Sequence, residues 1–372
     1  MSAPLPPGLT DEQRLLAETL DRFAAERVAP RADAIEQDRL PDELLAEAFG
    51  EQLLQLAALP EELGGAGGDL PMALLVAERL APASAALAGV AASAGACTTA
   101  VAAAGAESAP GALARLLDGA LVVLADAGAA GAVLAVAAGG GERVLDGLLP
   151  SVPGAGAADA LLLLSDDGGE PSACLIECDA DGVELRPAPA RTGLRGDRAA
   201  TVELRGVRVA PGATCLGAAA VTAARAHRRL AWAAIALGVG REALSLALAY
   251  LQERRQFGQP LGAFRALRDR TGTLAAELDA AGALLHATVR RPDVLRAGGA
   301  GAVARAALVA SETAVRASVD AVQLHGGYSY TDEYRVSRLM RDAASIRAAA
   351  GGARQLRAAS APPALAALAG AR

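Results

Sequence analysis

Apolar residues recur at two different spacings along this chain, and the change between them divides it into three parts. In the first part Leu16, Leu20 and Phe23 fall three or four positions apart, which places them on one face of a helix. The polar residues just before them, Thr10-Asp11-Glu12, suit a helix N-cap and an acidic first turn. We therefore expect a helical region from about residue 9 to residue 117.

The middle part of the chain, from residue 119 to about 217, follows the spacing of strands. It carries apolar residues two positions apart and short apolar runs bounded by Gly, Asp or Ser, and both patterns are typical of strands. These pairs and runs are Val183/Leu185, Val202/Leu204, Val207/Val209, Leu121 to Leu124, Val133 to Val136 and Leu161 to Leu164. A small β domain is expected here.

Helical spacing returns from residue 218 to 355, in long alanine-rich stretches that suit an antiparallel bundle. A break from Arg291-Pro292 to Gly301 separates two of its helices. The predicted domains are therefore an N-terminal helical domain at 1–118, a middle β domain at 119–217 and a C-terminal helical bundle at 218–372.

Composition excludes some classes of function and gives a weaker indication of the fold. Hydrophobic residues make up 53% of the 372 residues but aromatics only 2%, which favours close-packed helices over an aromatic-rich β core. The net charge is −7 and no basic block stands out, so we expect no nucleic-acid partner. The first ten residues do not resemble a signal peptide, and no long apolar run lacks interruption, so we expect a cytoplasmic protein that does not bind a membrane. The four scattered cysteines indicate reduced thiols and no zinc site.

Two short motifs in the C-terminal part carry the candidate chemistry. The first, from Glu253 to Leu261, reads ERRQFGQPL and places paired guanidiniums beside an aromatic ring and a glycine, a set suited to a pyrophosphate and a ring edge. The second, from Gln323 to Tyr328, reads QLHGGY, and its adjacent glycines let backbone approach a ligand closely. Taken alone, the first motif also fits a helix C-terminus with a glycine stop.

Both motifs resemble the C-terminal signatures of the acyl-coenzyme A dehydrogenases. The resemblance continues through the chain in the family's order, with a PEELGGAG loop at 60–67 and a GLRG segment at 193–196. It implies a mainly α fold with a central β domain: an N-terminal helical domain, a middle β-barrel or sandwich domain and a C-terminal four-helix bundle. It also implies FAD as the cofactor and an acyl thioester as the substrate, whose α proton is removed by a carboxylate while hydride passes from the β carbon to the flavin.

Under this resemblance the two motifs supply cofactor contacts. Arg254 and Gln256 match the family's contacts to the flavin pyrophosphate and adenylate, and Phe257 matches its ring contact. A second set of backbone and amide contacts is matched by Gln323, Gly326 and Gly327. In the family these contacts reach across a dimer interface to the flavin of the neighbouring subunit.

The positions that would hold this chain's own flavin look different. Where the family has a hydroxyl-bearing flavin loop, residues 125–131 read ADAGAAG. Where it has a tryptophan and a threonine against the flavin ring, the chain has Ser151 and Pro153, and proline has no N–H to donate. We predict that this subunit does not hold a flavin on its own β domain.

The family's catalytic base is also missing. Ala350 occupies the usual glutamate position and Arg228 the alternative one, and a guanidinium offers no proton acceptor. Arg229 matches a recurrent arginine next to that alternative position and is assigned to substrate binding. His227 and His286 have no orienting partner in the sequence and are expected to be helix-face or core residues. We therefore name no catalytic residue.

These observations favour one hypothesis and leave two open. The chain is most like the base-less subunit of actinobacterial heterotetrameric acyl-CoA dehydrogenases, in which a paralogous, glutamate-bearing subunit shares the FAD. The first alternative is a self-sufficient flavoenzyme with a displaced base or a flavin-dependent oxygenation. The second is a non-catalytic scaffold of the same fold. The acyl group, and whether its carrier is coenzyme A or a protein, stay open.

Overall fold

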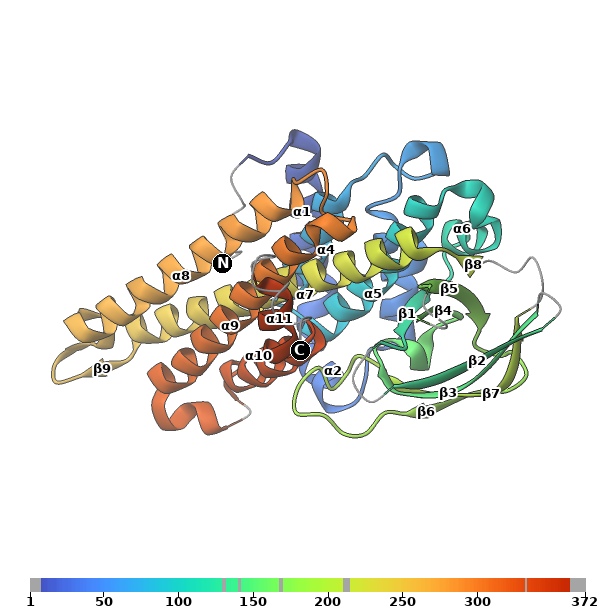
Figure 1. Cartoon of the computed structure of the whole chain (residues 1–372). Coiled ribbons are helices and arrows are strands. Elements are labelled where there is room, and N and C mark those ends of the chain that lie inside the picture. Colours follow the sequence, from blue (N-terminus) through green and yellow to red (C-terminus); the bar gives the residue numbers. More distant parts are fainter. Residues whose placement is uncertain are drawn as a thin grey trace, which may run out of the picture.

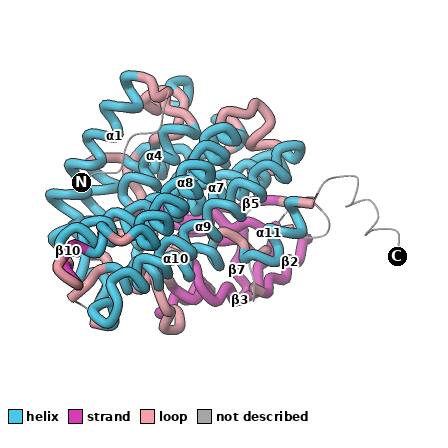
Figure 2. Tube along the Cα trace, turned by 90° about the vertical axis from the view of Figure 1, so that its left-hand side faces the viewer, coloured by secondary structure: helices cyan, strands magenta, loops and turns pink. Residues whose placement is uncertain are grey.

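The computed structural model describes residues 8–128, 132–139, 142–166, 170–209, 215–331 and 333–361. Two β-sheets form one end of the elongated molecule, and long helices run from them to the opposite end (Figure 1). Viewed at 90° to this, the helices lie side by side above the strands (Figure 2).

The N-terminal region is helical, as its spacing predicts. Helix α1 (Asp11–Phe23) begins at Thr10 with a capping box: the Thr10 hydroxyl accepts from Gln13 N, and Thr10 N donates to Gln13 Oε1, each at 3.2 Å. The predicted cap is confirmed. The further helices, joined by short 3₁₀ and π turns, are α2 (Ala32–Gln37), α3 (Asp42–Leu45), α4 (Leu70–Leu80), α5 (Ala85–Ala104) and α6 (Pro110–Leu117).

Within its described residues, the β region forms two four-stranded sheets. The first has the order β1 (Val122–Asp126), β4 (Ala160–Ser165), β5 (Ser172–Glu177) and β8 (Cys215–Leu216). The second has the order β2 (Val133–Gly139), β3 (Glu142–Val152), β7 (Ala200–Val209) and β6 (Val183–Pro187). Every residue of β1 and β4 is buried, which explains why these strands read as apolar runs, whereas on β7 the inward positions Val202 and Leu204 alternate with more exposed ones.

The described part of the C-terminal region has five α-helices: α7 (Ala218–Glu253), α8 (Arg265–Val289), α9 (Ala300–His325), α10 (Val336–Ala349) and α11 (Gly352–Ser360). Small residues let α7 approach its neighbours closely. A Cβ at Gly240 would lie 2.9 Å from the Leu278 side chain of α8 and 3.1 Å from Ala314 Cα of α9, so a larger residue there would push these neighbours apart. Alanine-rich helices therefore pack at short range, as the composition indicates.

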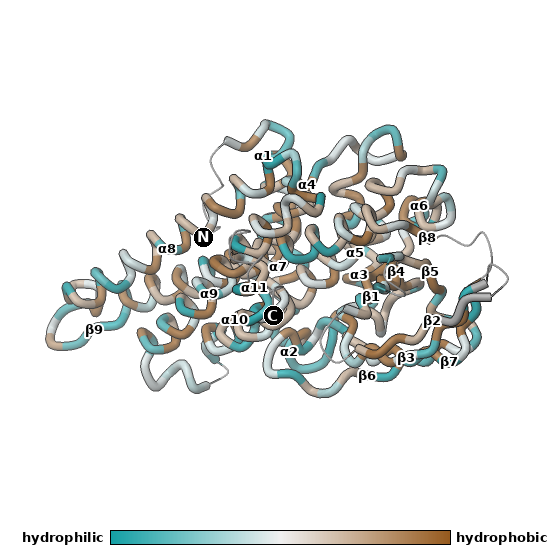
Figure 3. Tube along the Cα trace, in the orientation of Figure 1, coloured by the Kyte–Doolittle hydropathy of each residue, from teal (hydrophilic) through white to brown (hydrophobic). Residues whose placement is uncertain are grey.

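Among the helices that the structure describes, α5 and α7 are long and apolar enough to cross a membrane by length and composition alone. Both lie largely inside the fold and pack against each other, as core helices do. Coloured by hydropathy, the chain shows brown positions along the interior helices and teal ones at many outer turns (Figure 3). The predicted fold class is confirmed; the domain boundaries at 118/119 and 217/218 stay predictions.

The first C-terminal motif is a hairpin, and its glycine does not end a helix. Helix α7 stops at Glu253, and the chain then forms β9 (Arg255–Gln256) and β10 (Gln259–Pro260), which pair antiparallel. The two residues between them, Phe257 and Gly258, have φ angles of 50° and 80°, the left-handed backbone of a tight hairpin turn. The helix-terminus interpretation of this motif is therefore wrong in its placement of the glycine.

Candidate functional site

The structure brings the two C-terminal motifs together on one exposed surface, which we call the hairpin platform and define by Arg254, Gln256, Phe257 and residues 323–328. Arg254 caps α7, and its guanidinium carbon lies 5.5 Å from the centroid of the Tyr328 ring, a cation–π contact between the motifs. Phe257 is 92% exposed at the hairpin turn. The platform lies at the end of the bundle remote from the sheets, where β9 is labelled in Figure 1.

The glycines of the platform are open to a ligand. Helix α9 ends at His325, and Gly326 continues into a 3₁₀ turn with φ of 63°, a backbone that favours glycine. A Cβ at Gly326 or Gly327 would meet no atom within 4 Å. Gln323 is exposed one turn earlier. The platform thus offers an arginine, an aromatic ring, an amide and uncovered backbone to whatever faces it.

The end of β1, where the flavin loop was expected, is filled by an ion-pair cluster around Asp126. The Asp126 side chain is 2% exposed and accepts from Arg225 Nη2 and Arg228 Nη2, each at 2.8 Å, and from Arg225 Nε at 3.2 Å. Arg225 also binds both carboxylate oxygens of Asp166 at 2.8 Å. Burial alone would raise the pKa of Asp126, but the charge of Arg228 and the hydrogen bonds from Arg225 outweigh it and hold that pKa below its usual range.

The same cluster occupies the backbone donors of the loop. Gly128 N donates to Asp126 Oδ1 at 2.9 Å, and Ala127 N donates to Leu164 O at 2.9 Å. A Cβ at Gly128 would lie 2.9 Å from Arg225 Nη2, so the guanidinium already fills the space beside the glycine. Residues 129–131 of the predicted loop lie outside the described residues. In its described part, the N–H groups of Ala127 and Gly128 are engaged within the chain, and residues 125–128 carry no side-chain hydroxyl for a flavin.

The positions matched to the family's flavin-ring contact, Ser151 at the end of β3 and Pro153 just after it, carry no aromatic ring. Ser151 is exposed, Val152 between them is buried, and Pro153 is half-buried and has no N–H. Gly154 then takes a φ of 78°. Among the described residues of these two segments, the side chains supply neither a hydroxyl donor for a flavin at 125–128 nor an aromatic ring at 151 and 153, so we assign no chemical step to a flavin at this position.

No proton acceptor stands at either base position. Ala350 is 1% exposed and ends α10, where its N donates to Ile346 O at 2.8 Å. Arg228 is bound to Asp126, and its Nε is buried without a partner. Arg229 is half-buried, and its Nε lies 4.0 Å from the Cβ position of Gly351, which places a cation beside the turn after α10. Burial and the charge of Arg228 lower the pKa of Arg229.

Comparison with known proteins gives the family. A model described as "Acyl-CoA dehydrogenase, N-terminal domain" matches residues 10–117, and one described as "Acyl-CoA dehydrogenase, C-terminal domain" matches residues 216–360. The chain belongs to the acyl-CoA dehydrogenase family. Together the two matches include both helical regions, and the second contains the whole hairpin platform.

Relatives and solved structures agree with this assignment. A probable acyl-CoA dehydrogenase, YngJ, of Bacillus subtilis is 34% identical over 186 residues, 46% of each chain. The 3-sulfinopropanoyl-CoA desulfinase of Paraburkholderia xenovorans is 32% identical over 48% of this chain and 47% of its own. The chain thus spans, in these alignments, about half the length of the relatives it matches.

Similarity of fold extends over the whole chain. Butyryl-CoA dehydrogenase from Megasphaera elsdenii superposes with a TM-score of 0.84 at 23% identity, covering 98% of this chain and all of that one. A glutaryl-coenzyme A dehydrogenase solved with glutaryl-CoA gives 0.84 at 25% identity, covering 99% of this chain and 98% of its own.

Within this family member, one carboxylate that the sequence did not single out has a pKa near neutrality. Burial raises the pKa of Asp342 to about 7, while the hydrogen bond from Leu194 N, at 2.7 Å, opposes that rise. The bond joins the segment between β6 and β7 to α10. Asp342 lies two turns of α10 before Ala350, so it is placed as a structural tie and not at the base position.

The histidines are also engaged with neighbours. Nδ1 of His227 lies 2.7 Å from the hydroxyl of Thr99 on α5, and burial lowers the pKa of His227 to about 4. Nδ1 of His325 lies 2.7 Å from Ala321 O, and the His325 ring stacks on Tyr250 with 4.6 Å between ring centroids. His286 lies 3.8 Å from Glu78. Among the described residues, no group of His, Cys, Asp and Glu is arranged to hold a metal ion.

Proposed function

We propose that this chain is the non-catalytic subunit of a two-component acyl-CoA dehydrogenase that desaturates an acyl thioester, and that its hairpin platform completes the FAD site of a glutamate-bearing paralogous subunit. One contrast carries the proposal. The platform is exposed and its glycines are uncovered, whereas the chain's own flavin loop is filled by Arg225 and Asp126.

The chemistry of the platform suits an extended cofactor held by another chain. Arg254 supplies a charged donor for a pyrophosphate oxygen, and Phe257 supplies an exposed ring to cover an apolar face. Gln256, Gln323 and the glycines 326–327 supply amide and backbone groups around them. FAD, when bound between the chains, supplies the acceptor for the hydride from the substrate's β carbon.

The residues of this chain indicate which catalytic groups the partner subunit must supply. Arg228 and Ala350 leave no side chain here that accepts the α proton, so the partner supplies the carboxylate. Arg229 adds a positive charge near Gly351 and is proposed to orient the anionic or carbonyl end of the thioester where the two subunits meet. The closed symmetry of such a pair predicts a heterotetramer with about one FAD per two chains.

Flavin content tests the proposal. The chain expressed alone should purify without stoichiometric FAD, and co-expression with its glutamate-bearing paralogue should give a complex that contains it. Arg254→Ala in that complex should weaken FAD binding about tenfold or more, because a hydrogen bond to a charged group is worth roughly 1.5–3 kcal/mol. Arg265→Ala is the matched control, since Arg265 is an exposed arginine of α8 outside the platform. A lone chain saturated with FAD would refute the proposal.

The base assignment is tested in the same complex. Changing the partner's glutamate to glutamine should lower turnover by about 10²–10⁴, the usual worth of a general base. Ala350→Glu in this chain should not restore it, because Pro153 and the filled loop leave no flavin beside that position. Rescue by Ala350→Glu would show that this chain has a working site of its own.

A further inference from the structure

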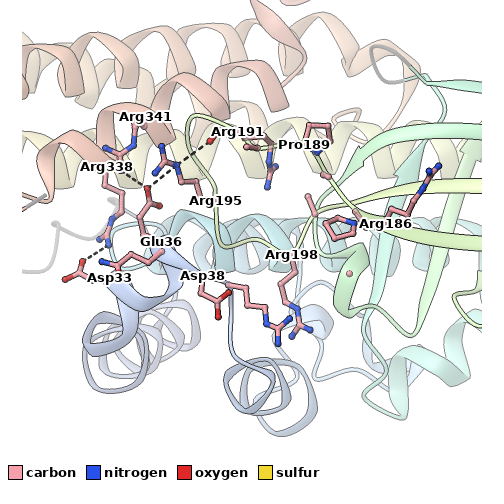
Figure 4. Close-up of a pocket in the computed structure, with 18 of the residues that line it drawn as sticks. Asp33, Glu36, Asp38, Arg186, Pro189, Arg191, Arg195, Arg198, Arg338 and Arg341 are labelled. Carbon is pink, nitrogen blue, oxygen red and sulfur yellow. Dashed lines mark hydrogen bonds and ion pairs between the residues drawn. The ribbon is translucent and has the colours of Figure 1, made fainter.

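A cavity lies away from both the hairpin platform and the Asp126 cluster. It has a volume of about 890 Å³ and is bounded by α2 and the residues just after it, by the segment from β6 to β7, and by the start of α10 (Figure 4). None of the platform residues lines it. Ligand pockets for small molecules commonly measure about 300–1,000 Å³, so this cavity is of a size to hold one.

One wall of the cavity is rich in arginine. Four of its arginines are neutralised by carboxylates that do not line the cavity: Arg186 by Glu203, Arg191 by Asp197, Arg198 by Asp42, and Arg335 by Glu242. The four that remain are Arg39, Arg195, Arg338 and Arg341. They face three lining carboxylates, Asp33, Glu36 and Asp38.

Two of these guanidiniums, those of Arg341 and Arg195, converge on the carboxylate of Glu36. Arg341 Nη2 donates to Glu36 Oε1 at 2.6 Å, and Arg195 Nε lies 3.8 Å from the same oxygen. Arg341 Nε is buried without a partner. Figure 4 shows Arg341 and Arg195 at Glu36, and Arg338 beside them reaching Asp33. The two guanidiniums can therefore donate to more oxygens than the Glu36 carboxylate supplies.

Arg338, beside these two arginines, has a buried donor without an acceptor. The residue is only 8% exposed, and its Nη2 is buried without a hydrogen-bond partner. Its ion pair runs from Nη1 to Asp33 at 3.3 Å, and the Asp33 side chain is 83% exposed. Burial lowers the pKa of Arg338. A buried donor without an acceptor is costly, and an incoming anion removes that cost.

Another part of the lining is apolar. It is formed by Leu185 and the proline- and alanine-rich stretch 187–190. An inorganic ion needs no such surface. The cavity therefore suits an organic molecule with an anionic group at one end.

We propose that this cavity binds an organic phosphate of about nucleotide size. The phosphate oxygens accept hydrogen bonds from Arg338 Nη2 and Arg341 Nε, with the charge of Arg195 beside them, and the organic body lies along residues 187–190. Planar guanidinium donors match the spacing of phosphate oxygens, and the three neighbouring cations, Arg195, Arg338 and Arg341, suit a dianion. The site does not depend on the proposed role of the hairpin platform.

Isothermal titration of the full chain with ADP, inorganic pyrophosphate and adenosine tests the proposal. ADP should bind one per chain, more weakly as salt rises, and adenosine should bind much more weakly than ADP. Arg338→Gln and Arg195→Gln should each weaken ADP binding about tenfold, as expected for loss of a charged donor. Arg195 is half-exposed, so its variant tests the site even where Arg338→Gln impairs folding. Glu36→Gln should tighten ADP binding, because it removes the carboxylate that competes for the donors.

Two control variants locate the site. Arg270→Gln removes an arginine of a surface pair with Asp320, and Arg254→Gln removes the charged donor of the platform; both should leave ADP binding unchanged. Loss of binding in Arg254→Gln, with no effect of Arg195→Gln, would assign the ADP to the platform and overturn the proposal. Failure to bind ADP, binding of pyrophosphate without ADP, or adenosine as tight as ADP would overturn it as well.

Discussion

Replacing Asp126 with asparagine tests whether the ion-pair cluster at the end of β1 is a structural replacement for a cofactor loop. Asparagine keeps the shape of the side chain and an oxygen for Gly128 N, but removes the charge that two arginines share. Breaking a buried ion pair by removing one partner costs about 3–5 kcal/mol. Here Arg225 retains Asp166, and the Arg228 side chain is 23% exposed, so we expect a loss of about 2–3 kcal/mol in the free energy of unfolding.

Urea unfolding followed by fluorescence measures this loss, because the only tryptophan, Trp232, is buried on the same helix as both arginines. Asp166→Asn is the matched control: Asp166 binds the same arginine but its side chain is 51% exposed, so its loss should cost about 1 kcal/mol or less. Equal, small losses in the two variants would refute the idea that the buried charge of Asp126 organises this end of the sheet.

The same variant has a pH signature. The pKa of Asp126 in the folded chain lies below its ordinary value of 3.8, so its ionised form contributes stability that is present above that value and is lost as the pH falls through the folded pKa. The wild-type chain should therefore lose more stability than Asp126→Asn on acidification below about pH 4. Parallel acid-denaturation curves for the two proteins would contradict the assignment of that charge.

Three further substitutions have defined outcomes. Thr10→Ala should lower the free energy of unfolding by about 1 kcal/mol through loss of the capping box with Gln13, and an unchanged urea midpoint would count against the cap. Burial lowers the pKa of His227 to about 4, so the folded chain binds fewer protons than the unfolded chain between about pH 4 and 6.5. The free energy of unfolding should therefore fall as the pH falls through that window. His227→Gln should remove this pH dependence in urea titrations at several pH values. Gly89→Ala places a Cβ 2.7 Å from the Trp232 ring and should cost about 1–3 kcal/mol with an altered near-ultraviolet circular dichroism spectrum; a silent variant would show that the contact has room.

Local features of the fold were predictable because the residues that make them are neighbours in sequence. Thr10 caps α1 through a residue three positions away, and β1 and β4 read as apolar runs because both of their faces are buried. The fold class followed from such patterns together with the family resemblance. The hairpin after α7 was harder, since Gly258 fits a helix end and a tight turn equally well in sequence.

Features made by distant residues were not predictable. Arg225 is 99 positions from Asp126, and no pattern in either segment indicates that the two residues pair. Cys174 and Cys215 face each other across β5 and β8 with 2.8 Å between sulfurs, although the sequence suggested only scattered thiols. The arginine-lined cavity likewise collects groups from three separate segments. Such sites depend on how the domains pack, which no local pattern encodes.

Helix α7 runs unbroken from Ala218 to Glu253, with Arg228 near one end and Arg254 just beyond the other. At 1.5 Å per residue, the 26 residues between the two arginines correspond to about 39 Å. A helix packed on several sides does not bend back on itself. The hairpin after α7 therefore stays far from the β-sheets of its own chain. Arg254 therefore contacts Tyr328 at the far end of the bundle and lies beyond the reach of its own β domain. In the proposed complex, the length of α7 sets the distance at which Arg254 meets a flavin held by the other subunit.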